Sequence, residues 1–177
     1  MSTGWLKELE ERRKEKDDFF ATQHESPIPH GERKGFRGLK YFPPDRKFTI
    51  NTKLQRYEKP EIIQMATSAG TAQRFYRIGY FEFEISTDKV RVQAYQSAER
   101  KGDEIFIPFR DKTSGKDSYD SGRYLDFHSS KDDEYLIDFN FAYNPFCAYS
   151  DEYVCPFPPN ENWLDVEIRA GERKYHE

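Results

Sequence analysis

The sequence predicts a mainly β fold, an antiparallel small barrel or sandwich with an N-terminal helix on its surface. Three observations carry this prediction. The chain opens with a stretch rich in Lys, Glu and Arg, which favour helices. From residue 48 onward, short runs alternate apolar and polar side chains, as half-buried strands do. Aromatic residues make up 16% of the chain, so a core can form although the mean hydropathy is −1.00.

The length of 177 residues is typical of one domain. We therefore expect a single domain over residues 1–177, with a helix over 1–22 and a β-rich body over 39–177. A chain of this size buries enough surface to fold without disulfide or metal staples.

The first expected element is a helix that Ser2 or Thr3 caps and that ends near residue 21. Arg12, Arg13 and Lys16 fill its middle, and we expect this charged stretch to be a solvated face. Its apolar side chains lie at its two ends, where they can anchor the helix to the body: Trp5, Leu6, Leu9, Phe19 and Phe20.

Alternation then predicts a series of strands. Residues 48–54 and 61–67 form the first two, and residues 80–95 form a long antiparallel hairpin that turns at 86–89. The buried parity switches next to Gly79, which predicts a β-bulge. Short strands at the spacing of a sandwich or barrel complete the set: residues 104–109, 124–127, 134–139 and 165–170.

Polar side chains inside these strands are the first candidates for a site. Strand interiors normally avoid Asp and Asn, yet Asp126 and Asp138 lie in expected strands, and Asn140 shares a face with Asp138. If residues 135, 137 and 139 point into the core, then this second face meets either solvent or a polar cavity. Alternation does not choose between the two.

The polar connection 108–123 is the second candidate region, because loops this long inside a compact domain tend to be functional or disordered. Thr113, Ser114 and Tyr119 offer hydroxyls, and Arg123 can hold an anion or carbonyl with its two-pronged guanidinium. The alternative is ordinary turn chemistry, because the stretch lacks the glycine spacing of a phosphate-binding loop.

The third region, residues 141–162, is rich in proline and aromatic residues. Cys147 is either a nucleophile or a buried structural thiol, and the sequence offers no neighbouring His to activate it. Glu161 with Asp138 or Asp126 can form an acid and base pair, whereas an ion pair between Glu161 and Arg123 is the structural alternative. Whether Cys147 and Cys155 lie close together is open at this point.

Charge excludes some partners. The formal net charge of −4 gives no cationic field for phosphates, so we expect no nucleic-acid partner. No apolar run has the length of a membrane span and no apolar leader opens the chain, so we expect no membrane partner and a cytoplasmic location. The four His and two Cys show no zinc spacing, and no metal is predicted. Asp126, Asp138 and Glu161 offer the hard oxygen ligands that Mg²⁺ or Ca²⁺ prefers, but we rank metal binding there below the binding of an organic ligand.

Several strings in the chain form a recognisable set. They are PFRDKTSG (108–115), GRYLD (122–126), DFNFAYNPFCAY (138–149), CPFPPNEN (155–162) and AGE (170–172), with DFF (18–20), SP (26–27) and FRGLKYFPPD (36–45) upstream. These strings closely resemble the uncharacterised prokaryotic family catalogued as domain of unknown function 1684. The resemblance spans nearly the whole chain and implies one domain. It names no activity. Because the family's motif positions are mostly polar, Gly or Pro, the resemblance favours a shared pocket over a purely structural network.

The function predicted from the sequence is the binding of a small polar ligand. One alternative is a hydrolase that uses Glu161 or Asp138 as the base and Arg123 to stabilise negative charge. Another is a protein-interaction module that uses residues 143–159. The sequence names no cofactor and no oligomeric state. The predicted ligand-binding residues are Asp111, Thr113, Ser114, Tyr119, Arg123, Tyr124, Asp126, Asp138, Asn140, Asn144, Tyr149, Glu161 and Asn162.

Overall fold

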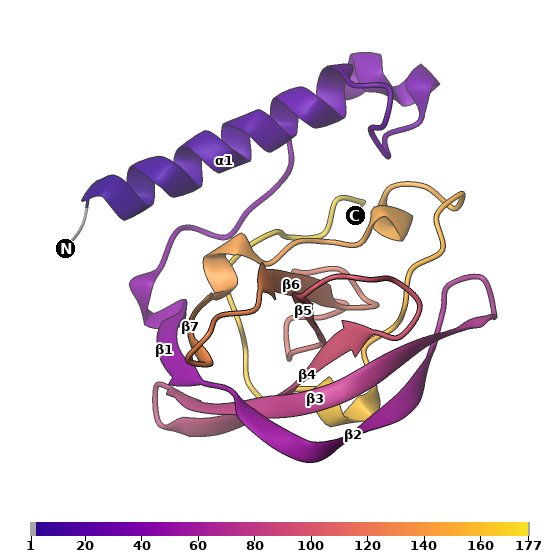
Figure 1. Cartoon of the computed structure of the whole chain (residues 1–177). Helices are drawn as coiled ribbons and strands as arrows, with labels where there is room; N and C mark the ends of the chain where they lie inside the picture. The colour runs from indigo at the N-terminus through magenta and orange to yellow at the C-terminus, as the bar shows by residue number, and fades with distance from the viewer. Residues whose placement is uncertain (1–2, 177) are drawn as a thin grey trace.

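The computed structural model describes residues 3–176, and within them two antiparallel sheets lie beside one long helix (Figure 1). The elements are α1 (Thr3–Thr22), β1 (Thr49–Lys53), β2 (Gln55–Ala66), β3 (Ala72–Ile85), β4 (Asp88–Ser97), β5 (Glu104–Phe109), β6 (Arg123–His128) and β7 (Glu134–Asp138). Five short 3-10 helices join them: η1 (His30–Gly35), η2 (Arg46–Phe48), η3 (Phe139–Phe141), η4 (Phe146–Ala148) and η5 (Asn160–Asn162).

The larger sheet has the order β2-β3-β4-β5-β6, with β2 and β6 at its edges among the described residues. It therefore does not close into a barrel, and the two sheets form a sandwich-like arrangement. The predicted hairpin is confirmed as β3 and β4, which pair from Ile85↔Asp88 to Phe75↔Ser97. The predicted bulge is also confirmed, since the register shifts between Arg77 and Gly79. A Cβ on Gly79 would lie 2.3 Å from the Gln55 carbonyl oxygen, so strands β2 and β3 approach each other too closely there for any side chain.

The smaller sheet pairs β1 with β7, from Thr49↔Asp138 to Lys53↔Glu134. As alternation predicts, Tyr135, Ile137 and Phe139 are buried. The main core lies between the two sheets, where these residues meet apolar side chains from the inner face of the larger sheet: Phe81, Val92, Ile105, Ile107 and Phe109.

Helix α1 lies across one end of the sandwich and packs on it by its two ends (Figure 1). Leu9 and Phe20 are buried and Trp5 and Phe19 are half-buried, which confirms the two anchors, but Leu6 is exposed and is not part of them. Ser2, a predicted cap, lies outside the described residues. The expectation of a solvated middle is wrong for two residues. Arg13 donates to the Asn140 carbonyl oxygen at 3.3 Å, and Lys16 pairs with Glu172, because the polar second face of residues 138–144 lies directly beneath the helix.

The strand predicted over residues 165–170 does not form. The segment keeps the alternation, with Leu164, Val166 and Ile168 buried and Asp165 and Glu167 exposed. However, it has no ladder with a neighbouring strand. Side chains from residues 111 and 123 bond to its backbone instead, as described below.

Candidate functional site

A groove of about 690 Å³ lies on the face of the larger sheet opposite the main core. Strands β5 and β6 pair with Phe106 opposite Asp126 and Pro108 opposite Tyr124. Because side chains alternate along a strand, Ile105 and Ile107 point into the core, whereas Phe106 and Asp126 point into the groove.

Aromatic rings form the floor of this groove. Phe75 of β3 stacks on Phe106 with ring centroids 5.5 Å apart, and Tyr124 meets Phe106 edge-on at 4.7 Å. Tyr143 in turn meets the Tyr124 ring at 5.8 Å. One wall is the loop 97–104, and the other comes from residues 145–156, including Phe146 and Tyr153.

Two hydroxyls fix the polar end of the floor. The Tyr143 hydroxyl donates to Oδ2 of Asp126, and the Tyr124 hydroxyl donates to the Pro156 carbonyl oxygen. Burial is the main cause that raises the pKa of both phenols, so each stays a neutral donor at physiological pH. Asp126 itself is exposed. Tyr143 is not among the residues predicted for the site, although its place in the string 138–149 marked the segment.

Charged groups surround the floor. Glu104 lies on β5 two residues from Phe106 and lines the groove with Asp126. At the rim, Glu99 pairs with Arg74 at 3.6 Å, while Arg100 and Lys101 line the loop wall. The carboxylates of Glu104 and Asp126 therefore lie on the floor, whereas the loop carries the cations together with Glu99.

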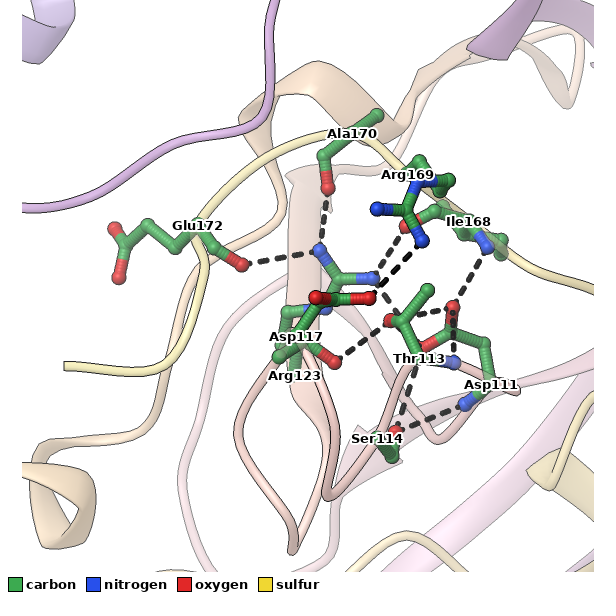
Figure 2. Close-up of polar contacts among 10 residues, drawn as sticks. Asp111, Thr113, Ser114, Asp117, Arg123, Ile168, Arg169, Ala170 and Glu172 are labelled. Carbon is green, nitrogen blue, oxygen red and sulfur yellow. Dashed lines mark hydrogen bonds and ion pairs between the residues drawn. The ribbon is translucent and has the colours of Figure 1, made fainter. Parts of the chain in front are cut away.

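Arg123 and Asp111 lie elsewhere, in a fully buried network (Figure 2). Nη2 of Arg123 donates to Oδ1 of Asp111 at 3.3 Å and to the Ile168 carbonyl oxygen at 2.8 Å. Nη1 donates to the carbonyl oxygens of Ala170 and Glu172. Oδ2 of Asp111 accepts from the Ile168 backbone N–H at 2.6 Å. The pair thus bonds to backbone groups of residues 168, 170 and 172, whereas the Gly171 carbonyl oxygen and the Glu172 N–H bond to the backbone of Phe42 and Ala142.

The two hydroxyls of the 108–115 string belong to this same network. Thr113 Oγ1 donates to Oδ2 of Asp111 at 2.8 Å, and Ser114 Oγ accepts from the Asp111 backbone N–H at 3.1 Å. Thr113 also bonds to Ser118 at 2.8 Å. Every one of these groups is bonded within the chain, which is the turn chemistry that the sequence left as an alternative.

Asn144 and Tyr149 meet at Glu172, a buried carboxylate that the sequence prediction missed. Its Oε1 accepts from the Tyr149 hydroxyl at 2.7 Å and from the Asn144 backbone N–H at 3.0 Å, and its Oε2 accepts from Lys16. Burial, and then the Glu172 charge, raises the pKa of Tyr149 well above its ordinary value. The only sequence signal for Glu172 was the three-residue string at 170–172.

Asp138 and Asn140 lie together beneath α1, as their shared face predicts. Asp138 Oδ1 accepts from Asn140 Nδ2 at 2.8 Å, and its Oδ2 accepts from Trp5 Nε1 at 2.7 Å. Asn140 also accepts from the Asp45 backbone N–H and donates to the Asp45 carbonyl oxygen. Asp138 and Asn140 therefore meet neither solvent nor an open cavity, whereas Leu136 on the same face is exposed.

Glu161 and Asn162 follow each other but serve different partners. Glu161 accepts from the Tyr95 hydroxyl and pairs with Arg77 at 2.6 Å. Asn162 is buried, accepts from the Gln93 backbone N–H at 2.7 Å and donates to the Pro108 carbonyl oxygen at 2.8 Å.

The predicted site residues therefore separate into several groups. The structure brings Tyr124 and Asp126 together in the groove, whereas Glu161, Asp138 and Arg123 have separate partners in separate places. Tyr119 contacts the Cys147 sulfur at 3.7 Å. Within residues 3–176, no three His, Cys, Asp or Glu side chains gather where a metal ion would be held. No helix in that range is both long and apolar enough to cross a membrane.

Comparison with known proteins adds a family. The model of a family described as a protein of unknown function, DUF1684, matches residues 34–173. The chain belongs to the DUF1684 family. The match confirms the resemblance seen in the sequence, and the matched range contains the groove, the buried pair and Glu172, whereas Lys16 lies before it. No curated protein matches this DUF1684 chain.

A solved structure resembles the whole DUF1684 chain. It is the solution NMR structure of an uncharacterised protein from Haloarcula marismortui, 40% identical, with a TM-score of 0.75. The match covers 98% of this chain and 96% of the archaeal one, so it includes the N-terminal helix as well as the sheets. Neither finding indicates a specific function.

Proposed function

We propose that this protein binds a small polar ligand, an organic amine with an apolar body, in the groove over β5 and β6. The observation that carries the proposal is the position of the Asp126 carboxylate at the edge of an aromatic floor. Aromatic faces attract cations as well as apolar groups, and a carboxylate pairs with an ammonium group.

The size and lining of the groove support this ligand class. A volume of about 690 Å³ lies within the range of roughly 300–1,000 Å³ that small-molecule sites occupy. Glu104 adds a second carboxylate on the floor, so the negative charge favours a cation over an anion there. The hydroxyl of Tyr143 orients Asp126 and remains a neutral donor.

The proposal keeps Tyr124 and Asp126 from the sequence prediction and assigns the other predicted side chains to the protein itself. Arg123 and Asp111 bond to each other and to backbone, which leaves little capacity for a ligand. A hydrolase that combines Glu161 with Arg123 gains no support, because Glu161 pairs with Arg77 instead.

Benzylamine and phenylacetate are suitable probes, because both carry a phenyl ring on one methylene and differ in the sign of their charge. We would titrate each into the ¹⁵N-labelled full chain and follow backbone amide shifts. Benzylamine is expected to move the amides of residues 97–104 and 124–126 in a saturable way, and phenylacetate is expected not to. Equal shifts with both probes, or none with benzylamine, would overturn the proposal.

A matched pair of variants tests whether the Asp126 carboxylate is the group that binds the amine. Asp126→Asn keeps the shape of the side chain and removes its charge, so benzylamine affinity should fall at least about tenfold, the equivalent of roughly 1.4 kcal/mol. Asp165→Asn removes an exposed carboxylate that lies outside the groove and should leave the affinity unchanged. Equal affinity in the two variants would exclude Asp126 as the amine partner.

A further inference from the structure

The two cysteines of the chain meet in space. Cys147 lies in η4, and Cys155 lies in the segment that crosses the groove face of the larger sheet. The backbone N–H of Cys147 donates to Sγ of Cys155 at 3.4 Å, so the two side chains are neighbours. Both are free thiols. A disulfide between them would close the short loop of residues 147–155.

The surroundings of the two sulfurs give the two thiols different pKa values. Interaction with the neighbouring Cys155 thiol is the main cause that lowers the pKa of Cys147 to about 7. The same interaction, with burial, raises the pKa of Cys155 far above its ordinary value. Near neutral pH, Cys147 is therefore substantially thiolate, whereas Cys155 keeps its proton.

Other groups near the pair support this assignment. The Tyr119 hydroxyl lies 3.7 Å from the Cys147 sulfur, and the Ser68 hydroxyl accepts from the Cys155 backbone N–H at 3.1 Å. Burial raises the pKa of Tyr119 to about 12, so it remains a donor rather than a second anion. Tyr124, the remaining titratable neighbour of both sulfurs, is likewise neutral because burial raises its pKa.

We propose that Cys147 and Cys155 form a reactive dithiol that reduces a small hydroperoxide and closes to an intramolecular disulfide. Cys147 is partly exposed and attacks, whereas Cys155 is buried and resolves. The oxidant must be small, because the surrounding aromatic residues restrict access to the pair: Tyr119, Tyr124, Phe146 and Tyr153. This inference does not depend on the amine site, although Cys155 lines the same groove.

The reaction balances in two steps. The Cys147 thiolate attacks one peroxide oxygen, so an S–O bond forms, the O–O bond breaks, and the leaving hydroxide or alkoxide takes a proton from water. Cys147 is then a sulfenic acid. The Cys155 sulfur attacks the Cys147 sulfur, an S–S bond replaces the S–O bond, and the departing hydroxide leaves as water with the Cys155 proton. Two electrons pass from the thiols to the peroxide.

The first experiment uses the reduced full chain and hydrogen peroxide. After treatment, the intact mass under denaturing, non-reducing conditions should show a monomer that has lost two hydrogens and takes up no iodoacetamide. Dithiothreitol should restore two alkylatable thiols. The proposal fails if both thiols stay alkylatable after peroxide, if Cys147 gains oxygen with no disulfide, or if the disulfide joins two chains.

Variants separate the two roles. Cys155→Ser should stop at a Cys147 sulfenic acid that dimedone traps, and Cys147→Ser should leave Cys155 unmodified. Tyr119→Phe should move the pH profile of Cys147 alkylation to higher pH while the disulfide still forms. Tyr153→Phe is the matched control, because Tyr153 packs on Phe146 at 5.2 Å and no hydrogen bond joins its hydroxyl to the Cys147 sulfur. An unshifted profile in Tyr119→Phe would remove Tyr119 from the proposal, and equal reactivity of Cys155 in Cys147→Ser would overturn the assigned roles.

Discussion

Arg123 and Asp111 form an ion pair in which both side chains are 0% exposed, and together they hold the backbone of residues 168–172. The pair hydrogen-bonds to backbone groups of this segment, as a neighbouring strand would do elsewhere in a sheet. Because the guanidinium presents donors on two nitrogens and the carboxylate accepts on two oxygens, one pair satisfies both carbonyl and N–H groups of an extended segment. The last part of the chain is thereby attached to the sandwich without a ladder of its own.

Removing one member of this pair should destabilise the fold strongly. In Asp111→Ala the guanidinium loses its countercharge, and the Ile168 N–H loses its acceptor, so we expect a loss of about 3–5 kcal/mol in the free energy of unfolding. Asp165→Ala breaks the exposed Lys112–Asp165 pair and should cost less than about 1 kcal/mol. Urea unfolding of both variants tests this, and similar midpoints would contradict it.

The Lys16–Glu172 pair should couple helix α1 to the body. In Lys16→Met the Glu172 carboxylate, which is 2% exposed, keeps Tyr149 and Asn144 but loses its cation. We expect a loss of about 1–3 kcal/mol. Lys14→Met changes an exposed position on the same helix and should be neutral within about 0.5 kcal/mol. If thermal and urea unfolding show no difference between the two variants, the helix is not held by this pair.

The exposed pair His128–Asp103 gives a pH dependence with a definite sign. The hydrogen bond from His128 Nδ1 to Asp103, 3.1 Å long, is the main cause that raises the pKa of His128 above 6.5. A raised folded-state pKa means that the stabilisation is complete below the unfolded value and is lost as the pH rises through the folded one. NMR titration of the His ring protons should show the raised value, and Asp103→Asn should lower it. An unchanged value in the variant would contradict the assignment.

The sequence predicted more about the sheets than about the site, for a physical reason. Alternation reports which side chains share a face, so the hairpin, the bulge at Gly79 and the common face of Asp138 and Asn140 could all be predicted. It does not report what covers that face. Trp5 and Arg13 reach Asp138 and Asn140 from a helix that precedes them by more than a hundred residues, and no local pattern encodes that contact.

The same limit explains the site residues. Arg123 and Asp126 lie three residues apart in one strand, yet Arg123 is buried in the network with Asp111, whereas Asp126 is exposed in the groove. Alternation places these two side chains on opposite faces, but it does not report that the guanidinium of Arg123 meets the backbone carbonyl oxygens of Ile168 and Ala170. Glu172 was missed because a single carboxylate near the end of the chain resembles any exposed acid until Lys16 and Tyr149 are placed beside it.

Gly122 should also contribute to the stability of the fold, although less than the buried pair of Arg123 and Asp111. Its φ of +100° lies in the region that favours glycine, and an added Cβ would lie 2.5 Å from the Phe109 carbonyl oxygen. Gly122→Ala should therefore strain the backbone directly before Arg123 and cost about 1–3 kcal/mol. Gly35→Ala is the control, because no atom lies within 4 Å of its added Cβ. If urea unfolding gives equal free energies for the two variants, the close approach of residue 122 to β5 does not limit stability. A loss confined to Gly122→Ala, with amide shifts concentrated at residues 168–172, would link this turn to the buried pair.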